Sequence, residues 1–453
     1  MRFILVAGVA SLGGLLFGFD TGVISGALLF IKTDFVLSST RQGVVTSMVL
    51  VGAVVGAAVG GPLTDRLGRK PVIIAMAGLF TLGSLLSAGA SAVWMLLAAR
   101  LILGIAIGTA SMLTPLYLSE VAPAEKRGAT VSLNQFCITF GILLSYLVDY
   151  GFADVAGTWR WMLGIGCVPA ILLGGGMAFL PESPRWLAAH GRVGEAELVL
   201  QQLRGRTDVS DELSGLKRDL RRATSEASLA ALFATPAARM PLIIGIGLAI
   251  FQQITGINTV LYYAPTIFRT AGFASNAAAI LATVGIGIVN VLTTVVALLL
   301  LDHAGRRKLL LVGLAIMVVC LVAIAAAFSI GSGTIGGITA VALGAYVGGF
   351  AIGLGPVFWL LIAEIFPLAY RGRGMSVASI ANWGSNLVVA LVFLDLIRLL
   401  TPGGTFALFA GLTVVAFGFA WKLVPETSGR SLEEIESDLD RSLDVGKPTA
   451  VRL

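Results

Sequence analysis

The sequence predicts an all-α membrane protein in which twelve transmembrane helices form two six-helix bundles related by an internal repeat. Its 453 residues are 57% hydrophobic and only 12% charged, which is more apolar and less charged than soluble globular proteins are. Apolar runs of about 20 residues recur along most of the chain, and each can cross a hydrocarbon core as a helix. Three short motifs of the first half also return, in the same order, in the second half.

The spans are bounded by charged residues or by Pro and Gly. Those of the first half are predicted at residues 5–31, 42–63, 72–90, 94–119, 128–148 and 160–180. Those of the second half are predicted at residues 240–268, 277–301, 309–328, 335–363, 374–397 and 403–423. The first run has no A-x-A-type cleavage site before it passes into its polar residue, which favours a first span over a signal peptide.

A polar insert between the two sets defines the predicted domains. They are an N-terminal six-helix bundle (1–181), a cytoplasmic linker with short amphipathic helices (182–239), a C-terminal six-helix bundle (240–424) and a cytoplasmic tail (425–453). In the linker, EAELVLQQLRG and DELSGLKRDLRR have helical periodicity but are too polar to span. Loops rich in Lys and Arg alternate with loops poor in them, which places the basic loops, the linker and both termini in the cytoplasm. We therefore expect a multi-pass protein of the cell inner (plasma) membrane.

Charge and cysteine usage exclude several classes of function. The formal net charge of +6 comes from loops and chain ends, and no basic face interleaved with aromatic residues suggests nucleic-acid binding. Cys137, Cys167 and Cys320 lie inside apolar runs without CxxC spacing, so we expect neither a disulfide framework nor a metal site. There is no GxSxG, HExxH, Walker loop or Cys/His cluster, so no enzymatic activity is expected.

The repeated motifs duplicate acidic and basic residues together. GPLTDRLGRKP (61–71) returns as LLLDHAGRRKL (299–309), SEVAPAEKRG (119–128) as AEIFPLAYRG (363–372), and LPESPR (180–185) as VPETSGR (424–430). This favours salt-bridge networks built from the pairs Asp65 and Arg69, Glu120 and Arg127, Glu182 and Arg185, Asp302 and Arg306, Glu364 and Arg371, and Glu426 and Arg430. The alternative is a solvated basic loop, in which each pair contributes at most about 1 kcal/mol.

These motifs, with PESPRWL, RGATVSLNQF, QQITGINTVLYYAP and PETSGRSLEEIE, resemble the sugar porter family of the major facilitator superfamily. The resemblance covers about residues 5–440. It implies the major facilitator fold, with a monosaccharide site near the midplane between two bundles that open alternately to each side. It also implies a monomer. In such a carrier, the networks that the duplicated charges favour would hold the outward-open state from the cytoplasmic side.

Asp20 is an isolated acid within the first span, in GFDTG. A carboxylate in hydrocarbon is costly, so it is normally paired or functional. One interpretation is a structural ion pair with Arg100, the charge buried in the fourth run; the other is a proton carrier whose proton affinity changes with its distance from Arg100. Since GFDTG resembles the proton-coupled sugar porters, we predict symport, with Asp20 and Arg100 as the coupling pair and the proton as coupling ion without a cofactor.

A sugar site needs amides and hydroxyls for hydrogen bonds and aromatic faces for the ring. The seventh run supplies clustered amides around Gly256, which lets the helix unwind. By resemblance the sugar contacts are Phe17, Gln135, Gln252, Gln253, Asn258, Tyr262, Asn290, Trp359, Asn382 and Trp383. For each amide, interhelical hydrogen bonding remains the alternative, and a Trp near a helix end can be an interface anchor.

The predicted function is import of a monosaccharide together with a proton by alternating access. The sugar is a hexose such as glucose or galactose, or else xylose; Asn382 replaces a longer amide of some pentose-handling members, which favours a hexose. The alternatives are a proton-independent facilitator, against which Asp20 argues, and a non-transporting sugar sensor, against which the short tail argues.

Overall fold

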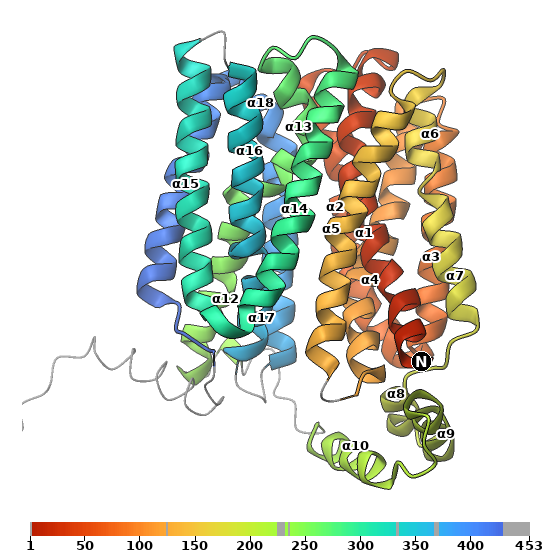
Figure 1. Ribbon diagram of the computed structural model, residues 1–453. Helices are drawn as coiled ribbons and strands as arrows, with labels where there is room; N and C mark the ends of the chain where they lie inside the picture. Colours follow the sequence, from red (N-terminus) through yellow and green to blue (C-terminus); the bar gives the residue numbers. More distant parts are fainter. Residues whose placement is uncertain are drawn as a thin grey trace, which may run out of the picture. The chain divides into compact units, whose positions relative to one another are not determined.

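The computed structural model of the chain describes residues 2–123, 126–223, 232–233, 236–331, 335–366 and 371–428 (Figure 1). Within these ranges the regular elements are α-helices, and eleven continuous segments are long and apolar enough to cross a membrane. Most coincide with predicted spans and extend a few residues beyond them, because helices continue into the polar membrane interface.

The first six spans are regular helices apart from one break. In chain order they are α1 (Arg2–Asp34), α2 (Ser39–Leu67), α3 (Arg69–Ala88), α4 (Val93–Val121), α5 (Arg127–Phe152), and then α6 (Thr158–Gly164) and α7 (Cys167–Ala178), which share one span. Glycines let α2 and α4 pack with their backbones in contact. A Cβ at Gly56 would lie 2.3 Å from the Ile105 carbonyl oxygen, and one at Gly108 would lie 2.1 Å from that of Ala53.

The linker folds as three short helices, α8 (Pro184–Ala189), α9 (Val193–Arg204) and α10 (Ser210–Ala223), near the start of α1 (Figure 1). They bury a small apolar core of Leu187, Ala196, Leu200, Val209 and Leu213. Arg204 fixes this group of helices to α4, because its Nη1 donates to the Val121 carbonyl at 2.8 Å and its Nε to Glu212 at 3.0 Å. At the start of α10, hydrogen bonds from Ser210 hold the pKa of Asp208 below its ordinary value.

The second half contains two further helix breaks and one kink. Its helices are α12 (Pro236–Ile254), α13 (Ile257–Thr270), α14 (Asn276–Ala304), α15 (Arg306–Ile330), α16 (Ile335–Ile352), α17 (Leu354–Glu364) and α18 (Arg371–Leu423). In α18, Thr401 has a φ of 62° and precedes Pro402, which cannot donate a helical hydrogen bond. The kink separates the two predicted spans 374–397 and 403–423, so α18 supplies the last two of the twelve spans.

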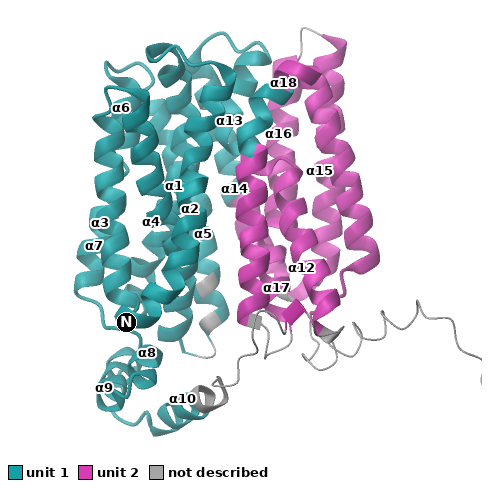
Figure 2. Cartoon of the chain, turned by 180° about the vertical axis from the view of Figure 1, so that it is seen from behind, with its two compact units in different colours: residues 1–224, 259–291, 390–396 teal, residues 225–258, 292–389, 397–453 magenta. Residues whose placement is uncertain are grey.

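Contacts divide the chain into two compact units (Figure 2). Unit 1 contains residues 1–224, 259–291 and 390–396, and unit 2 contains residues 225–258, 292–389 and 397–453. Unit 1 thus includes α13 almost entirely, the first half of α14 and a short part of α18. The predicted boundaries at 181, 239 and 424 follow the sequence repeat rather than these contacts, and they stay a prediction.

Candidate functional site

Asp20 and Arg100 form a buried ion pair within unit 1. Arg100 Nη1 donates to Asp20 Oδ1 at 2.8 Å, and the two side chains are 0% and 4% exposed. Asp20 lies in the middle of α1 and Arg100 in the first third of α4, two helices that pack together. Among the described residues, Arg100 Nε and Nη2 have no hydrogen-bond partner. The guanidinium therefore has donor capacity that the pair itself does not use.

Four amide side chains form one hydrogen-bond network within unit 2. Gln252 donates to the Leu354 carbonyl at 3.0 Å and accepts from Asn382 Nδ2 at 2.6 Å. Gln253 donates to Asn382 Oδ1 at 3.1 Å and accepts from Asn258 Nδ2 at 2.7 Å. The amides that the sequence predicts in the seventh and eleventh runs are thus brought together, and they form hydrogen bonds with one another.

Helix breaks position this amide network. α12 ends at Ile254 and α13 begins at Ile257, with Gly256 between them at a φ of 97°, where a side chain would be strained and its Cβ would lie 2.7 Å from Phe409. The second break, at Gly353, precedes the Leu354 carbonyl that Gln252 bonds. Interrupted helices are tolerated in a membrane where they face protein or a cavity, as expected of a ligand site.

One hydroxyl that sequence reasoning missed supports the first break. Tyr346 of α16 is fully buried, and its hydroxyl donates to the Thr255 carbonyl at 2.9 Å. That carbonyl lies at the interruption between α12 and α13, where the helical hydrogen-bond pattern is broken. The available signal was a lone tyrosine inside an otherwise apolar run of small residues.

The remaining predicted sugar contacts are distributed over both units. In unit 2, Trp359 of α17 is 39% exposed, whereas Trp383 of α18 is buried. In unit 1, Asn290 and Tyr262 are buried, and Gln135 is partly buried on α5. That these residues act together on one sugar stays a prediction.

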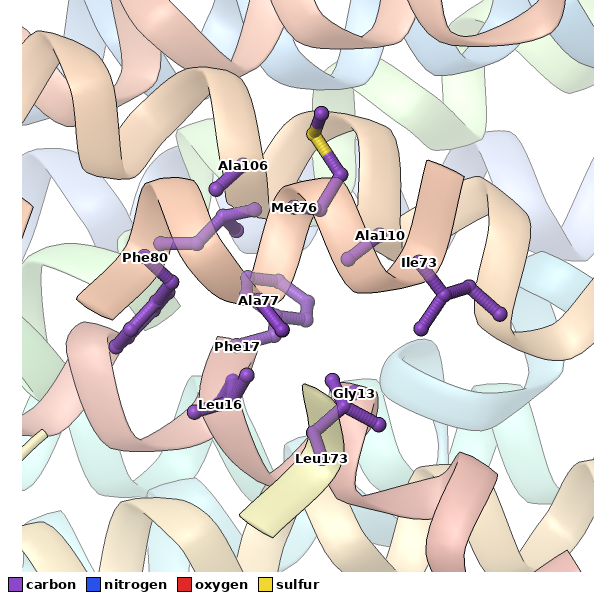
Figure 3. Close-up of a pocket in the computed structure, with 11 residues that line it drawn as sticks. Gly13, Leu16, Phe17, Ile73, Met76, Ala77, Phe80, Ala106, Ala110 and Leu173 are labelled. Carbon is purple, nitrogen blue, oxygen red and sulfur yellow. The ribbon is translucent and has the colours of Figure 1, made fainter. Parts of the chain in front are cut away.

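Phe17 lines an apolar pocket within unit 1 (Figure 3). Residues of α1, α3, α4 and α7 surround it: Gly13, Leu16, Ile73, Met76, Ala77, Phe80, Ala106, Ile107, Ala110 and Leu173. Apart from the weakly accepting sulfur of Met76, none of these side chains can hydrogen-bond a hydroxyl group. The pocket itself does not match a polyol, and the sugar contact assigned to Phe17 stays a prediction.

A charged network lies at the ends of α2, α3 and α4 in unit 1. Arg69 makes a bidentate contact with Glu120, at 2.9 Å and 3.0 Å, and lies 3.4 Å from Asp65. Glu182 accepts the backbone N–H groups of Arg69 and Lys70, at 3.0 Å and 3.2 Å. Glu182 therefore caps the N-terminus of α3, where the helix dipole favours an anion.

Unit 2 repeats this arrangement. Arg306 pairs with Glu364 at 3.3 Å, and Glu426 accepts the backbone N–H groups of Arg306 and Arg307 at 2.8 Å and 3.2 Å. Glu426 thus caps α15 as Glu182 caps α3. Gly305, at a φ of 86°, precedes α15 and leaves room for the capping carboxylate. The structure thus reproduces the repeat that the sequence motifs predict.

Asp65 and Arg69 form one of the predicted pairs, and two further pairs join acids of these networks to arginines other than the predicted ones. Glu120 pairs with Arg69, and Glu364 with Arg306, because those arginines start the helices that lie beside the two acids. Among the described residues, Glu182 makes no ion pair with Arg185, since its oxygens are used by backbone donors. Of the predicted partners, Arg430 lies outside the described residues, as do the side chains of Arg127, Asp302 and Arg371.

The described part of the chain contains no group of three or more His, Cys, Asp or Glu side chains that could hold a metal ion.

Comparisons with known proteins identify the family of the chain. The family model described as sugar (and other) transporter matches residues 6–439. The D-xylose transporter of Levilactobacillus brevis is 45% identical over 436 residues, covering 95% of this chain and 94% of that protein. The galactose-proton symporter of Escherichia coli is 40% identical over 434 residues, covering 95% and 93%.

Among solved structures, the major facilitator superfamily proton:xylose symporter XylE, bound to 6-bromo-6-deoxy-D-glucose, has a TM-score of 0.81 and 35% identity. The match covers 96% of this chain and 99% of that one. The helix order, the duplicated caps and these matches along nearly the whole length lead to one assignment: the chain belongs to the sugar porter family of the major facilitator superfamily.

Proposed function

We propose that the chain imports a monosaccharide together with a proton across the cell inner membrane, by alternating access. The observation that carries the proposal is the fully buried ion pair of Asp20 and Arg100. A facilitator has no need of a titratable acid at this depth, whereas a symporter needs a group that binds and releases a proton during its cycle. The proposed carrier works as a monomer with both termini in the cytoplasm, and it uses no cofactor or catalytic step.

Coupling follows from the electrostatics of the pair. While Asp20 is ionised, its attraction to Arg100 compensates the loss of hydration. Protonation removes that attraction, and Arg100 can then turn its unused Nε and Nη2 donors to other acceptors. A conformation that separates the two groups therefore binds the proton more tightly than one that holds them together.

The amide network is the proposed sugar-binding part of unit 2. Gln252, Gln253, Asn258 and Asn382 offer donors and acceptors side by side, as neighbouring hydroxyls of a pyranose require. The relatives are described as transporters of D-xylose and galactose, and XylE as a proton:xylose symporter. We propose a hexose or xylose as the substrate of this chain.

Proteoliposomes test the coupling. An inward proton gradient is imposed, and uptake of radiolabelled glucose is followed with galactose and xylose as competitors. Wild-type protein should accumulate sugar above equilibrium, whereas Asp20→Asn should only exchange it or equilibrate it downhill. Asp154→Asn removes an exposed acid and should behave as wild type.

The second candidate is a facilitator in which Asp20 and Arg100 form only a structural pair, as their 2.8 Å contact also allows. Gradient-independent equilibration by both wild type and Asp20→Asn would establish that alternative and exclude symport.

A further inference from the structure

Asp149 of α5 is a buried acid that the proposed mechanism does not use. It is 0% exposed, and its Oδ2 accepts the Gly26 N–H at 3.1 Å. Among the described residues, its Oδ1 has no hydrogen-bond partner and no basic side chain pairs with it. An ionised carboxylate with a single N–H donor costs several kcal/mol in an apolar interior, so burial favours the protonated form of Asp149 in this packed arrangement.

The contact between α1 and α5 is shaped around this carboxyl group. A Cβ at Gly26 would lie 2.4 Å from Asp149 Oδ2, so no side chain fits there. One turn earlier, a Cβ at Gly22 would lie 2.0 Å from Ser145 Oγ. Two glycines on one face of α1 thus allow the helices to approach until a backbone N–H reaches the acid.

An apolar cluster lies one helical turn beyond Asp149, toward the helix ends that we predict to be extracellular. Its members are Leu29 and Phe30 of α1, Ala153 directly after the end of α5, and Ala277 and Ile280 of α14. Ala153 follows Asp149 by four residues and Leu29 follows Gly26 by three, so the cluster begins one helical turn beyond the contact between Gly26 and Asp149. The cluster therefore stays intact only while α14 remains packed against α1 and the end of α5.

The titratable groups around Asp149 provide no compensating charge. On α5, Tyr146 lies one turn earlier and donates its hydroxyl to the Leu261 carbonyl at 3.1 Å. On α1, Asp20 and Lys32 each lie six residues from Gly26, about 9 Å along the helix axis.

The two helices of the second half that belong to unit 1 are equally poor in charge near the acid. α14 has no charged residue between Asn276 and Leu301. On α13, Tyr262 interacts with Tyr146, and Arg269 acts on Lys32 rather than on Asp149. The Gly26 N–H is thus the one hydrogen-bond donor recorded for the carboxylate among the described residues, and burial outweighs it while the helices are packed.

We propose that Asp149 is a proton-linked gate residue, which holds a proton while α1, α5 and α14 are packed and releases it when α14 separates from them. The inference rests on the proposed alternating access, in which contacts of residues 259–291 with the first helices must open. Opening hydrates the carboxyl group, and a hydrated carboxyl is ionised at neutral pH. The proton enters and leaves on the same side, so it is not carried across; acidity on that side favours the packed arrangement.

A cysteine reporter at the cluster tests the gate. Cys137, Cys167 and Cys320 are replaced by serine, and Ala277→Cys is labelled from outside with a membrane-impermeant thiol reagent in proteoliposomes. Asp20→Asn is present throughout, so that the coupling acid contributes no pH dependence. Rates are normalised to an exposed Val36→Cys reporter, which corrects for the pH dependence of the thiol itself.

The labelling rate should rise between about pH 5 and pH 8, by at most about tenfold per pH unit because one proton is involved. Adding Asp149→Asn, which mimics the protonated acid, should make the rate independent of pH. Adding Asp154→Asn, at an exposed position two residues after the end of α5, should leave the pH dependence unchanged. A pH dependence that survives Asp149→Asn, or that is absent before it is introduced, overturns the proposal.

Infrared spectra give a second measurement that does not depend on the reporter. The carbonyl band of a protonated carboxyl group should be present in Asp20→Asn protein at neutral pH and absent once Asp149→Asn is added. Persistence of the band would also overturn the proposal. Failure of the proposed symport would look different: wild-type protein would not accumulate sugar, while the labelling still depended on pH.

Discussion

At the scale of single residues, burial determines what each polar group can do. Arg100 is fully buried, and its attraction to Asp20 compensates the free energy lost when its charge is removed from water. Asp65, by contrast, is 75% exposed at 3.4 Å from Arg69, so that contact contributes little. The same residue types therefore have different roles at the two depths.

Removing one partner of the buried pair should cost more than removing both. Arg100→Gln leaves Asp20 without its cation and should destabilise the protein by about 3–5 kcal/mol. Adding Asp20→Asn removes the orphaned carboxylate and should restore part of the apparent melting temperature in detergent. A double variant no more stable than Arg100→Gln alone would contradict this view of the pair.

Gln253 is the predicted sugar contact whose loss is easiest to interpret, because it both donates to Asn382 and accepts from Asn258. Gln253→Ala should weaken sugar binding by about tenfold to a hundredfold, the equivalent of one or two hydrogen bonds. Tryptophan fluorescence titration measures the change, and Gln201→Ala in the linker is the matched control. Unchanged affinity would leave the amide network with a purely interhelical role.

At the scale of elements, the helix starts of α3 and α15 are the parts most tightly specified by the sequence. Each begins after a glycine with positive φ, Gly68 at 100° and Gly305 at 86°, and each is capped by a glutamate. The capping glutamates lie more than 100 residues from the helices they cap. Such a start needs both the backbone conformation and the remote acid.

Gly68→Ala should disturb this start through strain and through contact with Glu182, since its Cβ would lie 2.4 Å from Oε2. We expect a loss of about 1–3 kcal/mol, seen as a lower melting temperature in detergent. Gly78→Ala in the middle of α3 meets open space and should be neutral or slightly stabilising. Equal effects of the two substitutions would argue against the capped geometry.

The elements also show what could be predicted from the sequence. The membrane spans could be predicted because the length of an apolar run alone defines them. The amide side chains could be predicted because they interrupt apolar runs. The capping role of Glu182 could not be predicted, because backbone N–H donors are present at almost every residue and leave no signal in the sequence. Asp149 escaped notice because the predicted fifth span ended at residue 148, whereas α5 continues to Phe152 and buries the acid.

At the scale of the whole molecule, duplication is the organising feature. The pair of Arg69 and Glu120 with its cap in unit 1 corresponds to the pair of Arg306 and Glu364 with its cap in unit 2. Each pair lies within a single unit, the first in unit 1 and the second in unit 2. Each network should therefore contribute independently to the conformational equilibrium.

Single substitutions Arg69→Ala and Arg306→Ala should each increase thiol labelling of the cytoplasmic cavity, because each removes contacts proposed to hold the outward-open state. In the double variant the two free-energy changes should add within about 0.5 kcal/mol. Lys217→Ala in the linker is a suitable control. Strong non-additivity of the two free-energy changes would show that the two networks are energetically coupled.

The closed amide network has a thermodynamic consequence for the proposed sugar site. Gln252, Gln253, Asn258 and Asn382 already bond one another, so an arriving sugar exchanges hydrogen bonds instead of adding them. Calorimetry should accordingly record a small binding heat and a dissociation constant toward the weak end of the biological range. Weak binding shortens the residence time of the sugar. Because the carrier must release its sugar in every transport cycle, faster release allows a higher turnover rate.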